Sequence, residues 1–390
     1  MTSCAAPPVP CNDPLGCLVI PPGGSIRIAY LLPLSGPFGH LGAEARGGIE
    51  LAVEERDRDL LGYPIEIVEG EPDCNRESLL KSATQIAIQA DILGVIGPFC
   101  PDSVLALSVL RDAGLAAISL PEATLPFDIN GVSPGVFRLS PDEQAQGRLV
   151  AEFAYHSLGA RRAAVLGDSS EYARNLERAF SQNFQMLGGD VTLKIDVSEE
   201  DAITAAFQQL STDPPDVIFL PLSRRLGDRA LRRYRDFPDL SQAALLGGDG
   251  LFDRELFRGI DSSDGLYVAG IAPDGERYAR FAEAWKAKFG EPPGTSQSVL
   301  AFDATGILLN AVEKVAEPDK SGMLVIGRQA LRTTIANLER YPGLSGTISC
   351  SPSGNCFVNG SLAVFTITPA QTSGERWPPE ILWRSDQDGS

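Results

Sequence analysis

Two loops in this sequence carry side chains whose types and spacing could do chemistry. Gly167-Asp168-Ser169-Ser170 follows an apolar run and could present a serine nucleophile, and Gly247-Gly248-Asp249-Gly250 places a carboxylate between glycines. Ester hydrolysis by a serine needs a histidine base that comes later in the chain. The sequence has only His40 and His156, and both precede the serine motif. We therefore do not expect an enzyme.

Nucleotide and nucleic-acid chemistry are disfavoured too. The sequence contains neither G-x-G-x-x-G nor G-x-x-x-x-G-K-[ST], so a phosphate cradle is missing. Its 51 acidic and 33 basic side chains give a net charge of -18, which disfavours nucleic acid and anionic membrane surfaces. The arginine-rich segment from Arg224 to Arg235 has helical spacing and is interpreted as a solvated helix face.

The cysteines indicate an oxidising compartment. There are seven, and setting Cys4 aside leaves an even number that can form disulfides. The spacings suit two small closed loops, and two further cysteines follow neighbouring parallel strands whose carboxyl ends lie close together. The expected pairs are Cys11–Cys17, Cys350–Cys356 and Cys74–Cys100. Zinc is the alternative, but C-x5-C spacing and only two histidines favour it little.

The first 24 residues are rich in proline and small side chains, so residues 1–24 are predicted to be a flexible tether. Thr2-Ser3-Cys4 resembles the end of a lipobox, which would make Cys4 a lipid-modified residue; an ordinary free cysteine is the alternative. No run reaches the roughly 20 apolar residues of a membrane span. We expect an extracytoplasmic chain that touches the membrane only through a lipid anchor.

Strands and helices alternate along the chain. Ile26 to Leu32 is an apolar strand that ends at Pro33, and Ala45, Ile49 and Val53 then recur at helical spacing. The same alternation continues, which predicts an α/β fold with parallel sheets flanked by helices. With 390 residues, 43% of them hydrophobic, the chain is long enough for two lobes.

The first unit also resembles a known family. Leu32-Pro33-Leu34-Ser35-Gly36-Pro37, Gly42 and the helix segment Gly48–Glu54 are similar to the opening of type I periplasmic binding proteins, the Leu/Ile/Val-binding group of ABC importers. The resemblance covers roughly residues 25 to 370. It implies two Rossmann-like lobes, three hinge crossings and a ligand cleft between the lobes. The implied division is 25–140 plus about 273–340 for lobe 1, and 141–272 plus about 341–390 for lobe 2.

The resemblance also implies ligand-binding residues, and loops beyond the carboxyl ends of strands are where an open α/β sheet binds ligands. Relatives hold a carboxylate with serine hydroxyls and a helix N-terminus in the loop that matches Phe99 to Ser103. The loop from Ser119 to Thr124 resembles their S-P-x-A-T, with one extra residue. The residues assigned to lobe 1 are Leu41, Cys100, Pro101, Asp102, Ser103, Glu122, Ala123 and Thr124. The family also carries a disulfide that matches Cys74–Cys100.

Lobe 2 contributes a tyrosine, an acid and a leucine to this implied site. Tyr172 matches the tyrosine of D-x-x-Y-G, which closes over the ligand. Asp249 matches the acid of G-x-E-G, which binds an α-ammonium group. Leu222 falls where some relatives place a tyrosine, as Leu41 does. The alternatives are that Asp249 stabilises a turn and that Tyr172 packs on its own lobe.

Departures from the family pattern bear on the ligand. Pro101 stands where relatives often carry serine, so a hydroxyl and a backbone N–H are missing there. Glu122 and Asp249 together would favour a cationic group on the ligand, and Arg224 or Arg225 could counter them. The predicted function is a solute-binding protein that binds an amino acid or a related small polar solute by lobe closure. It would act as a monomer with an ABC permease and its ATPase, and no cofactor is implied. The alternative is the ligand-sensing domain of a receptor or an amide-sensor protein.

Overall fold

The computed structural model describes residues 11–70, 72–100, 102–121, 134–258, 265–319, 322–360, 362–373 and 376–384. The chain divides into two compact units, residues 1–140 with 297–358 and residues 141–296 with 359–390. The chain thus passes from one unit to the other after Ser140, Ser296 and Val358. The predicted α/β fold with repeated crossings is confirmed.

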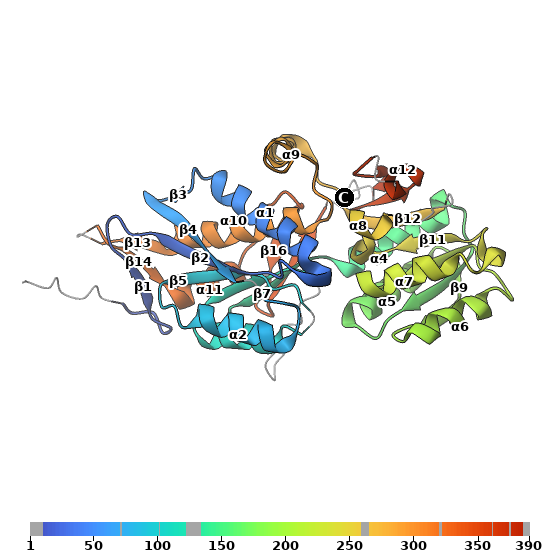
Figure 1. Ribbon diagram of the computed structural model, residues 1–390, viewed down its shortest axis with the longest axis horizontal. Coiled ribbons are helices and arrows are strands. Elements are labelled where there is room, and N and C mark those ends of the chain that lie inside the picture. Colours follow the sequence, from blue (N-terminus) through green and yellow to red (C-terminus); the bar gives the residue numbers. More distant parts are fainter. Residues whose placement is uncertain are drawn as a thin grey trace, which may run out of the picture. The chain divides into compact units, whose positions relative to one another are not determined.

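The main sheet of the first unit has a parallel centre. β2 (Ile26–Leu31) pairs in parallel with both β4 and β5, and β5 and β7 pair in parallel with β6. Figure 1 shows these strands with α2 on one side and α10 on the other. The order is β15 (Tyr341–Pro342), β16 (Thr347–Cys350), β17 (Asn355–Asn359), β7 (Val136–Pro141), β6 (Ala116–Ser119), β5 (Ile92–Ile96), β2, β4 (Tyr63–Gly70) and β3 (Asp59–Leu60).

Helices cover both faces of this sheet. α1 packs on α10, and α10 contacts β5 and β6, whereas α2 and α3 pack together against β2, β4 and β6. Gly48 lets α1 approach α10, because a Cβ there would lie 2.0 Å from the carbonyl oxygen of Ser298. The helices are η1 (Gly36–Phe38), α1 (Gly39–Glu54), α2 (Arg76–Ala87), α3 (Val104–Asp112), α10 (Gln297–Val315) and α11 (Arg328–Ala336).

The tether predicted for residues 1–24 is wrong for its described part. β1 (Cys17–Ile20) pairs antiparallel with β14 (Leu324–Gly327), which also pairs with β13 (Ala316–Pro318). Asp13 accepts hydrogen bonds from the amides of Gln329 and Ala330 at 2.9 and 3.0 Å, which caps α11. The physical reason is that the distant strand β14 pairs with Cys17–Ile20, a short apolar run between prolines whose local signal alone does not decide its structure.

The second unit repeats the pattern. β10 (Val217–Leu220) pairs in parallel with β8 and β11, β8 with β9, and β11 with β12. The strand order is β19 (Glu380–Arg384), β18 (Leu362–Ile367), β12 (Leu266–Ile271), β11 (Ala244–Gly247), β10, β8 (Arg162–Gly167) and β9 (Asp190–Asp196). β18 and β19 add antiparallel edges to this sheet.

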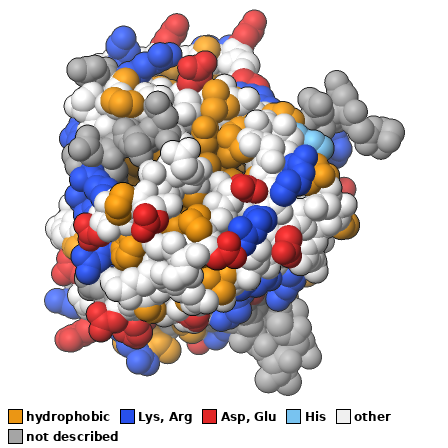
Figure 2. Space-filling model, turned by 90° about the vertical axis from the view of Figure 1, so that its right-hand side faces the viewer, with side chains coloured by type: hydrophobic (Ala, Val, Ile, Leu, Met, Phe, Trp, Pro, Cys, Tyr) orange, Lys and Arg blue, Asp and Glu red, His pale blue; other side chains and the backbone are white. Residues whose placement is uncertain are grey.

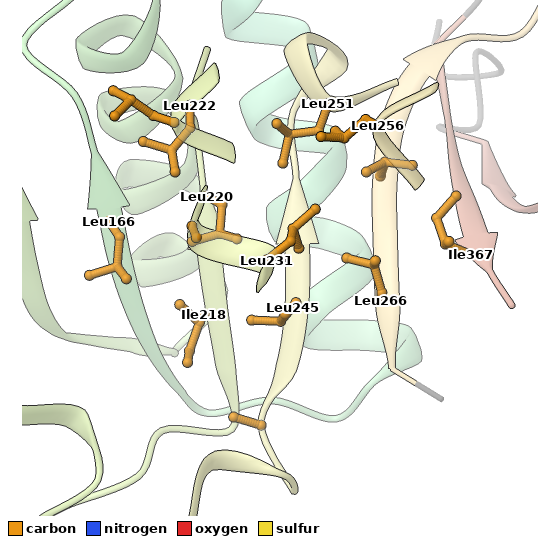
Figure 3. Packing of buried hydrophobic residues seen from close by; sticks show 14 of the residues in the cluster. Leu166, Ile218, Leu220, Leu222, Leu231, Leu245, Leu251, Leu256, Leu266 and Ile367 are labelled. Carbon is orange, nitrogen blue, oxygen red and sulfur yellow. The ribbon is translucent and has the colours of Figure 1, made fainter. Parts of the chain in front are cut away.

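Alternate residues of β10 enter two separate cores. Val217 and Phe219 pack with Phe180 and Phe184 of α5, whereas Ile218 and Leu220 pack on the opposite face with residues of α6 and α7. Figure 3 shows Ile218 and Leu220 with neighbouring leucines of this second cluster. The strand is apolar throughout because helices bury both faces.

The remaining elements of the second unit are α4 (Glu143–Glu152), η2 (Phe153–Ser157), α5 (Glu171–Met186), α6 (Glu200–Leu210), α7 (Arg224–Tyr234), η3 (Pro238–Leu240), η4 (Asp249–Leu251), α8 (Arg254–Phe257), α9 (Gly275–Phe289) and α12 (Pro369–Thr372). The division differs from the predicted one in two places. α9 belongs to the second unit and residues 341–358 to the first, where β16 and β17 extend the main sheet.

Strand order locates the loops that can bind a ligand. In the first unit the order reverses between β2 and β5, and in the second between β8 and β10. Ligands of open α/β sheets bind beyond the carboxyl ends of strands near such a reversal. These positions are the loops that follow Leu31, Ile96, Gly167 and Leu220, together with the neighbouring loop after β11.

Candidate functional site

The loop after β11 places Asp249 at the centre of a hydrogen-bonded cluster in the second unit. Its Oδ1 accepts a hydrogen bond from the Tyr172 hydroxyl at 2.7 Å and another from Nε2 of Gln146 at 2.9 Å. The Asp249 amide donates to Oε1 of Gln146 at 2.9 Å, and the Gly250 amide donates to the Tyr172 hydroxyl at 3.0 Å. Two residues predicted for the site, Tyr172 and Asp249, therefore lie together.

Two capped helices bring Gln146 and Tyr172 to this loop. Asp142 caps α4 by accepting the Gln144 amide at 2.8 Å, and Ser170 caps α5 by accepting the Ala173 amide at 3.1 Å. Each such cap contributes about 1 kcal/mol to helix stability. Gly147 lets the helices approach closely, since a Cβ there would lie 2.5 Å from that of Ala179. Gln146 and Tyr172 therefore project from two tightly packed helices.

Glycine is required beside the acid. A Cβ on Gly248 would lie 2.7 Å from the Tyr172 hydroxyl and 2.9 Å from Oε1 of Gln146. Both distances are shorter than real Cβ contacts, so a side chain at position 248 would displace one of the two groups. The glycines around Asp249 thus serve the cluster's close contacts.

The electrostatics of Asp249 set what the cluster can do. Burial raises the pKa of its carboxyl above the ordinary value, while the hydrogen bonds from Tyr172 and Gln146 oppose that rise. Both side chains that donate to it are neutral, and in the described residues both donate to Oδ1. An arginine or lysine in place of either donor would have compensated the negative charge of the Asp249 carboxylate. A carboxylate held in this way can accept a cationic group at Oδ2.

The residues predicted for lobe 1 fall into different environments. Cys100 is fully buried and bonded to Cys74, and Ser103 is fully buried at the start of α3. Asp102 is exposed to solvent, whereas Leu41 is only 6% exposed on α1. Pro101, Glu122, Ala123, Thr124 and the proposed lipid anchor Cys4 lie outside the described residues. The structure thus places Cys100 and Ser103 in the loop that follows β5.

The remaining cysteine pairs match the prediction. Cys11 is bonded to Cys17 and Cys350 to Cys356. Among the residues that the structure describes, no group of three or more His, Cys, Asp or Glu side chains is arranged to hold a metal ion.

Leu222 does not have the environment expected of a ligand contact. It has no exposed surface and packs in the core cluster with Leu226 and Leu251, as Figure 3 shows for Leu222 and Leu251. The physical reason is that the loop after β10 turns its apolar side chain into the core before α7 begins.

The arginines of α7 are largely paired with acids. Arg224 forms an ion pair with Asp253, whose side chain is 4% exposed, and Arg232 contacts Asp228 at 2.9 Å. Arg225 is exposed. On the face seen in Figure 2, Lys and Arg side chains are interspersed with Asp and Glu. This arrangement agrees with a solvated helix face, and Arg224 is engaged by Asp253 instead of Asp249.

A model of the periplasmic binding protein family matches residues 25–372. The chain belongs to this family. It is 23% identical over 346 residues to the Leu/Ile/Val-binding protein BraC3 of Rhizobium johnstonii, which covers 85% of this chain and 88% of that protein. Members of the family are substrate-binding proteins of transporters, not enzymes.

Solved structures show the same fold. The branched-chain amino acid transporter substrate-binding protein LivJ of Streptococcus pneumoniae, in complex with isoleucine, has a TM-score of 0.73 at 19% identity; the match covers 92% of this chain and 99% of LivJ. A solute-binding protein of an ABC transporter from Rhodopseudomonas palustris, in complex with 3,4-dihydroxybenzoic acid, has a TM-score of 0.70 at 16% identity, covering 88% and 93%. At these identities the likeness supports the fold alone.

No helix in the described ranges of this periplasmic binding protein is long and apolar enough to cross a membrane.

Gln146, which holds Asp249, was not predicted from the sequence because a glutamine in an amphipathic helix looks like a surface residue. The available signal was its place four residues after the Asp142 helix cap and directly before Gly147.

Proposed function

We propose that this periplasmic binding protein is the extracytoplasmic solute receptor of an ABC importer and that its ligand is an α-amino acid. The observation that carries the proposal is the carboxylate of Asp249, held by the neutral donors Tyr172 and Gln146. A partly buried anion without a cationic partner among its side-chain donors is stabilised by a ligand that brings a positive charge.

The charge of the cluster distinguishes between the ligands of the relatives. Isoleucine carries an ammonium group that could donate a charge-assisted hydrogen bond to Oδ2 of Asp249, whereas 3,4-dihydroxybenzoic acid has no cationic group and its hydroxyls could offer only neutral donors. Asp249 therefore favours an amino acid over an aromatic acid. For the ligand's own carboxylate we propose the backbone amides at the start of α3, where Ser103 precedes Val104, and, from the family resemblance, Thr124.

The mode of action follows from the family. We propose that the ligand is bound by closure of the two lobes and that the closed form is recognised by a permease. From the N-terminal sequence we also propose that Cys4 is lipid-modified. We further propose that the protein acts as a monomer. The disulfides of the structure support an extracytoplasmic location, because disulfides persist in oxidising compartments.

Isothermal titration tests the proposal with pairs of ligands that differ only in the ammonium group. L-Leucine, L-isoleucine and L-valine are titrated beside their deaminated acids, with 4-hydroxybenzoate and putrescine as further probes. We expect an amino acid to bind and its deaminated counterpart to bind at least tenfold more weakly, as expected for losing one charge-assisted hydrogen bond.

Asp249→Asn then tests the anchor. The variant keeps the size of the side chain and removes its charge, so we expect about tenfold to a hundredfold weaker amino-acid binding. Asp201→Asn, an exposed acid on α6 of the same unit, is the matched control and should bind normally. Equal affinity for an amino acid and its deaminated acid, or an Asp249→Asn variant with unchanged affinity, would refute the assignment.

A further inference from the structure

Gln146 is the one side chain that bonds to both the backbone and the carboxylate of Asp249 among the residues described. Its Nε2 donates to Oδ1 at 2.9 Å, and its Oε1 accepts from the Asp249 amide at 2.9 Å. The side chain has no exposed surface. Gln146 is therefore placed to act on Asp249 and has no exposed atoms with which to contact a ligand itself.

The two bonds fix the rotation of the carboxylate. One ties the amide of Asp249 and the other ties Oδ1 to the same planar group, so the angle between backbone and carboxylate is set by the geometry of the glutamine amide. Gln146 itself is held by α4, whose Asp142 cap and close contact at Gly147 leave the helix little room to move. Such support by an outer residue is what keeps a binding group in its productive geometry.

The neutrality of the amide matters as much as its position. A lysine or arginine at 146 would neutralise the carboxylate and remove its preference for a cation, and an apolar residue would leave the Tyr172 hydroxyl as the side-chain donor to Oδ1. A glutamine amide supplies a donor for Oδ1 and an acceptor for the backbone without adding charge. The carboxylate thus remains an anion with one oxygen already satisfied.

We propose that Gln146 is a positioning residue that determines ligand charge specificity, by holding Oδ1 of Asp249 so that Oδ2 receives the ammonium group of the ligand. This inference rests on the proposed function, because it assigns the partner of Oδ2. It adds that recognition depends on a buried residue that the ligand never touches.

The first test needs no ligand. The titration of Asp249 is followed by carbon NMR of its carboxyl in the full-length protein, and the signal is assigned by its loss in Asp249→Asn. In Gln146→Met the loss of one donor should raise the pKa of Asp249 further, because that hydrogen bond lowers it in the native protein. Gln371→Met is the matched control, since Gln371 is also buried in the second unit but bonds to Thr368. An unchanged titration in Gln146→Met would overturn the proposal.

The second test uses L-leucine and its deaminated analogue 4-methylpentanoate as probes. Gln146→Met should weaken leucine binding about tenfold to a hundredfold and leave 4-methylpentanoate binding unchanged, because only the ammonium contact depends on Oδ2. A merely structural role would weaken both probes equally, which would refute specificity. If Gln146→Met does not fold, Gln146→Asn, one methylene shorter, removes the same contacts with a polar side chain.

The two proposals fail in different ways. If Asp249→Asn abolishes leucine binding but Gln146→Met changes neither the Asp249 titration nor the preference between the probes, the proposed function stands and the role of Gln146 is wrong. If leucine does not bind but the Asp249 titration shifts in Gln146→Met, Gln146 holds the carboxylate and the amino-acid assignment is wrong for this probe.

Discussion

The buried carboxylate of Asp303 offers the sharpest stability test in the first unit. It lies on α10 with no exposed surface, and Oδ1 accepts the amide of Leu344 at 2.7 Å. Oδ2 accepts the amide and the hydroxyl of Ser345 at 2.7 and 2.5 Å. One acid therefore holds the loop that leads into β16, and Asp303→Ala would remove these acceptors together.

The cost follows from the donors left behind. The amides of Leu344 and Ser345 are buried, and each buried donor without an acceptor costs about 1 to 3 kcal/mol, so Asp303→Ala should lose roughly 4 kcal/mol. The Ser345 hydroxyl can rotate to another acceptor and is left out of this sum. Asp303→Asn keeps one oxygen and should lose about 2 kcal/mol. Both losses are large beside the 5 to 15 kcal/mol typical of a folded domain.

Urea denaturation followed by circular dichroism measures this loss. Trp285, Trp377 and Trp383 all lie in the second unit, so tryptophan fluorescence reports that unit alone. We expect the unfolding transition of Asp303→Ala that circular dichroism reports to begin at a lower urea concentration than the transition that tryptophan fluorescence reports. Asp112→Ala, with a side chain 68% exposed, is the control and should change stability by at most about 0.5 kcal/mol. A loss below about 1 kcal/mol in Asp303→Ala would show that the loop finds other acceptors.

Three further outcomes are expected. Removing the Cys74–Cys100 disulfide, which closes a loop of 26 residues, should lower the free energy of unfolding by about 3.5 kcal/mol in a chain-entropy model. Removing Cys11–Cys17, which closes a loop of 6 residues, should lower it by about 2 kcal/mol. Variants with both cysteines of a pair changed to alanine, unfolded in urea, measure the two losses. Burial opposes ionisation of Asp13, but hydrogen bonds from backbone amides and the charge of a nearby arginine lower the pKa of its carboxyl. Its contribution to stability is therefore present at neutral pH and is lost as the pH falls below the ordinary value of 3.8. Asp13→Asn should lower the free energy of unfolding at pH 7, and the difference from the native protein should disappear in acid. Gly248→Ala should weaken ligand binding about tenfold or more by displacing the cluster, whereas Gly167→Ala, with 3.6 Å of clearance, should bind normally in titration calorimetry.

The regular elements could be predicted because their signals are local. Val217 to Leu220 is an apolar run of strand length, and the structure makes all of it β10. β1 was not predicted, although its sequence Cys17-Leu18-Val19-Ile20 suits a strand, because prolines surround it and its partner β14 lies some 300 residues away. A short strand is decided by its pairing partner, which a local pattern does not contain.

The site could be predicted in part for a related reason. Tyr172 and Asp249 stand in short motifs that resemble the family's, and the structure joins them at 2.7 Å. Leu222 was assigned by position alone, and its apolar side chain is drawn into the core instead. Gln146 shares no local motif with Asp249, which lies 103 residues further along the chain, so only the tertiary fold brings α4 beside the loop after β11.

The surroundings of Asp249 are the argument for the proposed ligand contact over a purely structural role of this acid. A carboxylate kept for stability is usually matched to a cation or to several donors, as Asp303 is by two amides and a hydroxyl. Burial raises the pKa of Asp249 even though hydrogen bonds from Tyr172, Gln146 and backbone amides lower it, so these neutral donors do not fully offset the burial of its carboxyl. Under the proposed function, a ligand ammonium at Oδ2 would favour the charged form of Asp249, so the proposal assigns recognition to Asp249 and stability of the first unit to Asp303.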